Sequence, residues 1–191
     1  FKIGVAHCNF KLRNKESDDD SLFVKNICKI SSIPFFSKDF DINIPKHSVQ
    51  MSARKLRYEW FYQLLEIHKY DYILTAHHLN DSIETFLINL IRSTGIDGLT
   101  GIKSINNKVI RPLLYFNKSQ IMNYAFENKI QWREDSSNKK NDYLRNKIRN
   151  KLLPVLKDID SDFINNFSNT IDRLKDSSLI LKQYTESFKS L

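Results

Sequence analysis

Two imidazoles and two carboxylates stand close together in the chain, at His77, His78, Asp81 and Glu84. Side chains of these types can bind a cation, hold an amine or transfer a proton. A purely structural role is the alternative, because Asp81 and Glu84 have the spacing of a helix-capping box. One helix start needs only one cap, so four titratable groups exceed what folding requires. The cluster is therefore the first candidate for a functional site.

This cluster lies where a strand is predicted to lead directly into a helix. The apolar run 72–75 precedes it, and Asn80 or Asp81 can cap the helix that follows. The predicted helix has one apolar stripe, formed by Ile83, Phe86, Leu87, Leu90 and Ile91. Gly95 is placed to end the helix. Ligands of open α/β sheets usually bind at the carboxyl ends of strands, so this junction is a natural binding position.

The first half of the chain predicts the same alternation of strand and helix. Further strands are expected at residues 1–6, 33–40 and 109–113, and helices near Ser17 and Ser48. Such alternation implies a parallel sheet with right-handed crossovers, so the predicted fold class is α/β with one core. Polar side chains follow the first strand at His7-Cys8-Asn9, just as His77 follows the later one.

Loops and a capped helix are expected next. Three of the four glycines fall within residues 95–101, which predicts a loop with positive φ or close backbone approach. Asn117 and Gln120 have the spacing of a capping box for the helix that follows them. Residues 132–138 are polar and have no regular period, so they form either a surface turn or part of a site.

The last part of the chain is predicted to be helical. A helix is predicted to begin at Asp142, and its inner apolar stripe is formed by Leu144, Ile148 and Leu152. On its outer side, Arg145 and Arg149 share one face, and Lys147 and Lys151 share another. Such a helix can neutralise phosphates, but a solvated face is an equal alternative. Beyond Pro154, an apolar stripe from Ile164 to Phe188 with a spacing of about 3.5 residues predicts a long helix that serves as a strut or linker.

Composition limits the class of protein and its partners. The chain has 191 residues and a formal net charge of +8, which favours an anionic partner such as nucleic acid. Cys8 and Cys28 form no CxxC or metal-ligand spacing, so we expect a reduced, cytoplasmic protein. No apolar run is long enough to cross a bilayer, and we expect no membrane partner.

Four motifs occur in one order along the chain. They read HCNFKLR at residues 7–13, HHLNDSIET at 77–85, WREDSSN at 132–138 and RNKIR at 145–149. In this combination the chain resembles the tRNA(Ile)-lysidine synthase family, which belongs to the PP-loop ATP pyrophosphatases. The resemblance implies a Rossmann-like parallel sheet with helices on both faces in residues 1–157, a catalytic nucleotide-binding domain. Residues 158–191 would then be a long helix leading toward further tRNA-binding domains.

The family's reaction converts the wobble cytidine of an isoleucine tRNA to lysidine. ATP adenylates the C2 oxygen of the base, the amine of free L-lysine attacks that carbon, and AMP leaves. The resemblance therefore implies a cytoplasmic ligase with ATP and Mg²⁺ as cofactors and with tRNA(Ile) and L-lysine as partners. On the sequence alone, the protein can be either a monomer or a homodimer.

The resemblance and the charges of this reaction together suggest a role for each candidate residue. Cations would stabilise the charge that builds on the phosphates, and carboxylates would hold and deprotonate the lysine ammonium. The catalytic candidates are Arg57, Asp81, Glu84 and Arg145, with Arg149 as a second choice among the cations. The nucleotide-binding candidates are His7, Asn9 and His77, and the tRNA-binding candidates are Arg149, Lys147 and Lys151. Asp81 is also the candidate Mg²⁺ ligand, and all these residues are expected to converge on one hollow.

The chain departs from the family pattern in two places. The phosphate-binding Ser-Gly-Gly-x-Asp-Ser loop is absent from the sequence and is expected upstream of Phe1, so this chain alone should bind ATP weakly and not turn over. Phe10 stands where the family often has histidine. Two other functions stay open: a PP-loop tRNA thiolase, for which Cys8 and Cys28 look unsuited, and a non-catalytic basic RNA-binding module in which the acidic cluster is structural.

Overall fold

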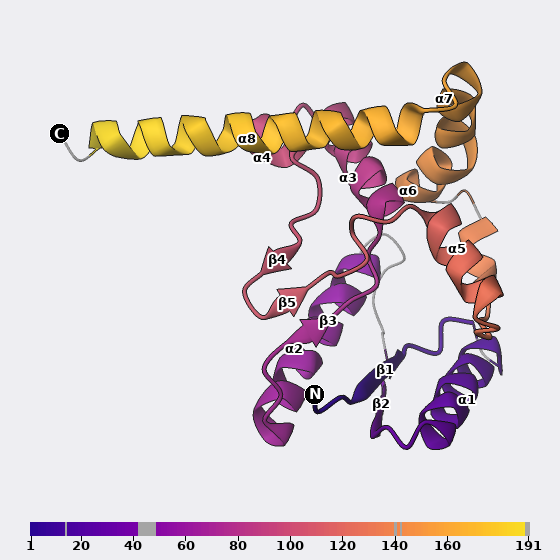
Figure 1. Ribbon diagram of the computed structural model, residues 1–191. Coiled ribbons are helices and arrows are strands. Elements are labelled where there is room, and N and C mark those ends of the chain that lie inside the picture. Colours follow the sequence, from indigo (N-terminus) through magenta and orange to yellow (C-terminus); the bar gives the residue numbers. More distant parts are fainter. Residues whose placement is uncertain (14, 42–48, 140, 142, 190–191) are drawn as a thin grey trace. The chain divides into compact units, whose positions relative to one another are not determined.

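The computed structural model describes residues 1–13, 15–41, 49–139, 141 and 143–189 (Figure 1). The single core expected from chain length is divided into two compact units, Phe1–Ile73 and Leu74–Leu191. Each unit is described by itself. The predicted helix starts at Ser48 and Asp142 lie outside the described residues.

The first unit contains a parallel strand pair joined by a crossover helix. Its elements are β1 (Val5–Asn9), α1 (Lys15–Ile30), β2 (Phe35–Asp39) and α2 (Val49–His68). β1 pairs with β2 in parallel from Val5↔Phe35 to Asn9↔Asp39, as the alternation of strand and helix predicts. Phe40, at the end of β2, stacks on Phe10 with ring centroids 4.9 Å apart and meets Trp60 of α2 edge-on. These aromatic contacts hold α2 beside the carboxyl end of β1.

The second unit begins with short strands. β3 (Ile73–Leu74) lies at the unit boundary, and the sheet order is β3-β5-β4, with β4 (Ile105–Asn106) and β5 (Val109–Ile110) antiparallel. The predicted strand 109–113 is therefore shorter and belongs to a hairpin. The reason is local, since Asn107 adopts a φ of 52° and so forms the kind of two-residue turn that joins antiparallel strands. The α/β class is confirmed by the parallel pair and its helices.

Helices make up most of the second unit. They are α3 (Leu79–Ile91), α4 (Ile96–Leu99), α5 (Lys118–Glu127), the 3₁₀ turn η1 (Ser136–Lys139), α6 (Leu144–Lys147), the π-helix η2 (Ile148–Leu152), α7 (Leu153–Ile159) and α8 (Phe163–Lys189). The buried cluster of this unit contains Leu79 and Ile83 of α3, Ile148, Leu153 and Ile164. Leu90 and Ile91, predicted to lie in the apolar stripe of α3, are exposed.

The π-helix corrects the predicted inner stripe of the basic helix. An α-helical spacing would bury Ile148 and Leu152, but the structure buries Ile148 and Leu153 and leaves Leu152 37% exposed. A π turn accommodates one additional residue, so the buried position after Ile148 comes five residues later instead of four. Leu144 is also exposed. The stripe predicted from sequence is thus wrong at two of its three positions.

The capping box predicted at Asn117 is confirmed, whereas the glycine loop predicted for residues 95–101 is confirmed only at Gly101, because Ile96–Leu99 form α4. Asn117 and Gln120 form a capping box at the start of α5, with Gln120 N donating to Asn117 Oδ1 at 2.9 Å. Gly101 has a φ of 71°, and a Cβ there would lie 2.9 Å from Ser82 Oγ. Ser82 is buried in α3 and accepts a hydrogen bond from Ile102 N at 3.0 Å. The loop after α4 therefore needs glycine for both its backbone conformation and its close approach to α3.

The long helix α8 packs on the second unit over its first half (Figure 1). Ile164, Ile171 and Ser178 are buried, and Ser178 Oγ donates to Asp97 Oδ1 of α4 at 2.6 Å. Beyond Ser178 the predicted stripe is exposed, as at Phe188. Its role in core packing therefore ends near that serine. Within the described part of the chain, no helix combines the length and apolarity needed to span a membrane.

Candidate active site

The start of α3 is capped by a different pair of residues from the one predicted. His78 is the N-cap, and its backbone N–H donates to Asp81 Oδ2 at 3.0 Å. The capping box thus pairs His78 with Asp81, so Glu84 is not needed as a cap. Asn80 does not cap its own helix either: its Oδ1 accepts from Lys118 N at 2.8 Å and ties α3 to the start of α5.

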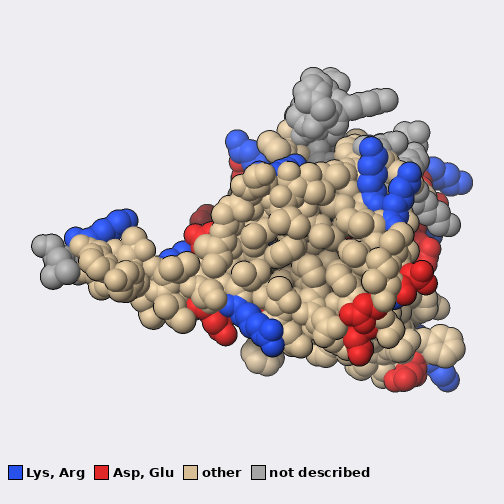
Figure 2. Space-filling model, turned by 90° about the horizontal axis from the view of Figure 1, so that it is seen from above, with Lys and Arg blue, Asp and Glu red and all other residues tan. Residues whose placement is uncertain are grey.

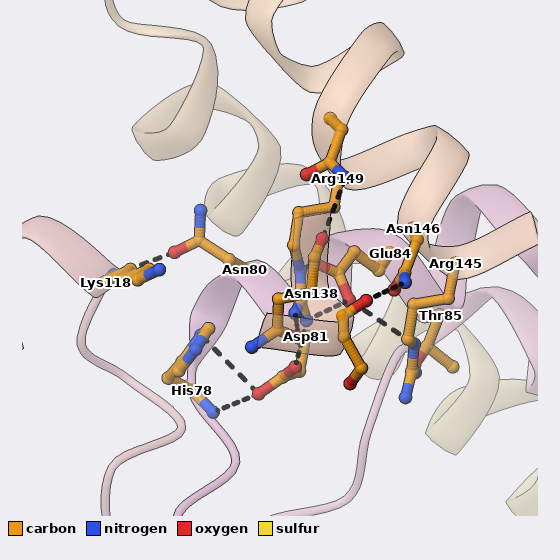
Figure 3. Close-up of polar contacts among 12 residues, drawn as sticks. His78, Asn80, Asp81, Glu84, Thr85, Lys118, Asn138, Arg145, Asn146 and Arg149 are labelled. Atoms are coloured by element: carbon orange, nitrogen blue, oxygen red, sulfur yellow. Dashed lines mark hydrogen bonds and ion pairs between the residues drawn. The ribbon is translucent and has the colours of Figure 1, made fainter. Parts of the chain in front are cut away.

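Glu84 is completely buried and paired with two arginines (Figure 3). Arg149 binds it through both carboxylate oxygens, Nε to Oε1 at 2.6 Å and Nη2 to Oε2 at 2.9 Å. Arg145 adds an ion pair from Nε to Oε2 at 3.3 Å. The hydrogen bond to Glu84 is the main cause that raises the pKa of Arg149. Such a two-point pair fixes both side chains in position as well as neutralising the buried charge.

Asp81 lies one turn before Glu84 and keeps contact with the surface. Its side chain is 14% exposed, whereas that of Glu84 is 0% exposed. Arg149 Nη2 lies 3.3 Å from Asp81 Oδ1, and His78 Nδ1 lies 3.5 Å from Asp81 Oδ2. Of the two predicted catalytic carboxylates, only Asp81 is therefore partly exposed.

The Asp81 carboxylate does not fit the predicted role of Mg²⁺ ligand. One oxygen is engaged by the Arg149 guanidinium and the other by the His78 backbone N–H, which hinders the close, octahedral coordination that Mg²⁺ requires. An ammonium ion can still share these oxygens, because a carboxylate accepts about four hydrogen bonds. Among the described residues, no group of three His, Cys, Asp or Glu side chains could hold a metal ion. A Mg²⁺ ion at this position would therefore need most of its ligands from substrate phosphates and water.

The two arginines turn inward, contrary to the outer face that their spacing predicted. Arg145 Nη2 donates to Thr85 Oγ1 of α3 at 2.7 Å, and Arg149 Nη1 donates to Asn138 Oδ1 at 3.0 Å. Lys147 and Lys151 are exposed, as predicted. The arginines turn inward because α3 presents a buried carboxylate that only a cation can satisfy.

Two residues missed by sequence reasoning, Asn146 and Asn150, complete this region. Asn146 Nδ2 donates to Ser137 O at 3.1 Å, and Asn150 Nδ2 donates to Asn138 O at 2.9 Å. The detectable signal was the repeated Arg-Asn pair, at residues 145–146 and 149–150, one helical turn apart. The polar loop 132–138 is thereby part of the site region at its Ser137–Asn138 end.

The other end of the β3–α3 junction carries His77. Its Nδ1 lies 2.9 Å from Thr75 Oγ1, which orients the imidazole ring within this turn. The nucleotide-binding role of His77 stays a prediction.

In the first unit, polar side chains gather at the carboxyl end of β1, as predicted. Asn9 is buried, donates to Asp18 Oδ1 at 2.7 Å and accepts from Lys11 N at 2.9 Å, so its amide holds the turn against α1. Arg57 of α2 is exposed and its guanidinium carbon lies 5.6 Å from the centre of the Phe10 ring. Burial lowers the pKa of His7. The expected convergence of Arg57 with Asp81 stays a prediction, since they belong to different units.

Cys8 gives a measurable test of this end of β1. Burial raises the pKa of its thiol to about 11, and the nearby Arg57 only partly offsets that effect. Because the thiolate is the reacting form, we expect alkylation by iodoacetamide at pH 8 to be about 100-fold slower in the native protein than in urea. Peptide mapping by mass spectrometry separates Cys8 from Cys28. Native and unfolded rates within threefold of each other for Cys8 would contradict this environment.

The parallel β1–β2 pair and the strand-to-helix turn at His77 define the class of protein. The chain belongs to the PP-loop domain family, whose model matches residues 1–156. The model of this family is named for ATP binding.

Curated relatives make the likeness more specific. They are named tRNA(Ile)-lysidine synthase in Porphyromonas gingivalis (38% identical, 98% of this chain and 42% of the relative), Chlorobaculum tepidum (38%, 97% and 56%) and Petrotoga mobilis (40%, 87% and 55%). The chain spans about half the length of these relatives. A solved structure, the U34-tRNA thiolase NcsA from Methanococcus maripaludis with its [4Fe-4S] cluster, superposes with a TM-score of 0.68. It is 14% identical over 88% of this chain and 61% of its own, so it supports the fold alone.

Proposed function

We propose that the protein to which this chain belongs ligates free L-lysine to C2 of the wobble cytidine of an isoleucine tRNA. The reaction would use ATP, pass through an adenylated tRNA, and release AMP and pyrophosphate. The observation that carries the proposal is the identity of 37–40% with curated tRNA(Ile)-lysidine synthases across most of the chain. The accessible carboxylate at the start of α3 supports it, because the reaction needs a group that holds and deprotonates an amine.

The burial of the site residues suggests which of them contacts the substrate and which holds the others in position. Asp81, partly exposed, would pair with the lysine ammonium and accept its proton, while the fully buried Glu84 would hold the arginines. Arg145 is the more exposed of those arginines, with 39% of its side chain accessible against 29% for Arg149. Arg145 is therefore our proposed cation for phosphate charge in this unit.

His7 and Asn9 of β1 and His77 of the second unit are the proposed nucleotide ligands. Arg57 of α2, close to the Phe10 ring, is a proposed catalytic cation. Any Mg²⁺ would come with the phosphates of ATP, since magnesium in such sites is bound largely through substrate phosphates. Cytoplasmic location and a possible homodimer remain part of the proposal.

The tRNA would be held in part by the exposed lysines of the α6–η2 segment. On the face that Figure 2 shows, Lys and Arg are interspersed with Asp and Glu and do not gather in one patch. Lys147 and Lys151 are the proposed pair, because both are exposed and they lie one turn apart.

We expect Lys147→Gln with Lys151→Gln to weaken tRNA binding and to make it less dependent on salt. Each lost phosphate contact reduces the slope of log K against log salt by about 1. The measurement is tRNA affinity of the intact protein from 50 to 200 mM salt. Lys175→Gln is the control, since that lysine is already paired with Asp172 at 2.8 Å on α8. An unchanged slope in the double variant would remove these lysines from the tRNA interface.

A tRNA thiolase is the nearest alternative, and the fold alone does not separate the two activities. Sulfur transfer through cysteine needs an accessible thiolate, whereas burial raises the pKa of Cys8 to about 11. The decisive experiment supplies the intact protein with ATP, labelled lysine and isoleucine tRNA. Label in the tRNA supports the ligase. Sulfur transfer without label supports the thiolase, and tRNA binding with neither reaction supports a non-catalytic RNA-binding module.

A further inference from the structure

The repeated Arg-Asn pairs bind two different parts of the second unit at once. Residues four apart lie on one helix face, so the two arginines share a face and the two asparagines share another. In the structure Arg145 and Arg149 reach α3, whereas Asn146 and Asn150 reach the backbone carbonyls of the Ser137–Asn138 turn. We call these four side chains the Arg-Asn clamp.

Arg149 is the member of the clamp that touches both parts. Its Nε and Nη2 bind Glu84, its Nη2 also lies beside Asp81, and its Nη1 binds Asn138 (Figure 3). All three guanidinium nitrogens are therefore engaged by protein oxygens. These contacts use four of the five guanidinium N–H groups, so to offer a tRNA phosphate a two-point contact Arg149 would have to leave Glu84, a carboxylate with no exposed surface. Breaking such a pair is strongly unfavourable.

The turn that Arg149 grips has an internal structure of its own. Asp135 Oδ1 accepts from Ser137 N at 2.9 Å and from Ser137 Oγ at 2.6 Å, and Asn138 N donates to Asp135 O at 3.0 Å. The turn thus packs as a preformed piece against the clamp. The π-helix allows this arrangement, because it buries Ile148 and Leu153 while Arg149, between them, points at α3.

We infer that Arg149 is a positioning residue that fixes Asp81 for the lysine ammonium and couples its position to the turn at residues 135–138, and that it is not a tRNA ligand. The part concerning lysine rests on the proposed function. The geometric part does not, because it concerns contacts among α3, the turn and the clamp alone. This inference stands against the tRNA-binding role predicted for Arg149, and the salt dependence of tRNA binding distinguishes the two.

The coupling is tested by hydrogen exchange in the intact protein. Glu84 does not contact the turn, but Glu84→Gln weakens the ion pair that holds Arg149 in position. The amides of Ser137 and Asn138 should therefore exchange about tenfold faster. Arg149→Gln should do the same, and Lys147→Gln, a neighbouring loss of charge, should not. Unchanged exchange in Glu84→Gln would overturn the coupling. Asn138→Ala leaves the Glu84 pair intact and gives a second test, should Arg149→Gln fail to fold.

Two further measurements separate positioning from tRNA contact. If Arg149 positions Asp81, then Arg149→Lys, which keeps the charge but loses the two-point pair, should raise KM for lysine about tenfold with little change in the salt slope of tRNA binding. Asn138→Ala should raise the same KM by a few-fold. A salt slope reduced by about 1 in Arg149→Gln would make Arg149 a phosphate ligand and overturn the inference. If the unaltered protein transfers no lysine to tRNA, the proposed function is wrong. The hydrogen-exchange rates and the salt dependence of tRNA binding still test the Arg-Asn clamp in that case.

Discussion

Asp81→Asn should reduce lysine transfer by about 10²–10⁴-fold and leave tRNA affinity nearly unchanged. The amide keeps the shape of the side chain and can still accept from His78 N, so the cap of α3 persists. It cannot hold an ammonium ion by charge or accept its proton. The measurement is incorporation of labelled lysine into isoleucine tRNA, with tRNA affinity and unfolding followed in parallel.

The matched control is Asp172→Asn, which removes one carboxylate from an exposed ion pair on α8. Such surface pairs contribute little to stability, so this variant should behave like the unaltered protein. If Asp81→Asn lowers stability and tRNA affinity together, in proportion to its loss of activity, Asp81 is a structural residue and the ligase proposal loses its proposed base.

Glu84→Ala should have the largest effect on stability, about 3 kcal/mol. Removing the carboxylate leaves Arg149 and Arg145 without their buried partner and creates a cavity beside Ile83, the other fully buried residue of α3. We place the loss at the low end of the range for buried pairs because both arginines are partly exposed and can regain water. The free energy of unfolding in urea, followed by circular dichroism, measures the loss.

Two companion variants test the cause of that loss. Glu84→Gln keeps the volume and one acceptor oxygen but replaces the other by a donor NH₂, so it should cost about 2 kcal/mol, less than Glu84→Ala. Combining Glu84→Leu with Arg149→Met removes both charges and should recover part of the stability lost in Glu84→Ala. A loss below about 1 kcal/mol in Glu84→Ala would mean that the pair contributes little to the fold.

Sequence reasoning succeeded where the signal involved residues close together in the chain. The β1–α1–β2 crossover, the capping box at Asn117 and Gln120, and the positive φ of Gly101 all follow from local sterics and hydrogen bonding. Sequence spacing also placed Arg145 and Arg149 on one face. It did not show what that face would meet.

The tertiary structure decided which of several locally acceptable arrangements formed. Two capping boxes were possible at the start of α3, and the His78–Asp81 box forms while Glu84 pairs with Arg149, 65 residues further along the chain. That pairing turns the arginine face inward, and burial of Leu153 in place of Leu152 accompanies the π turn.

The sequence by itself determined the residue types available for chemistry, their order and the α/β class. Only the tertiary structure decided that Glu84 is buried while Asp81 keeps contact with the surface, and that Arg149 grips both α3 and a distant turn. The physical reason is that the free energy of a buried charge depends on its partner, and here that partner comes from a remote part of the chain.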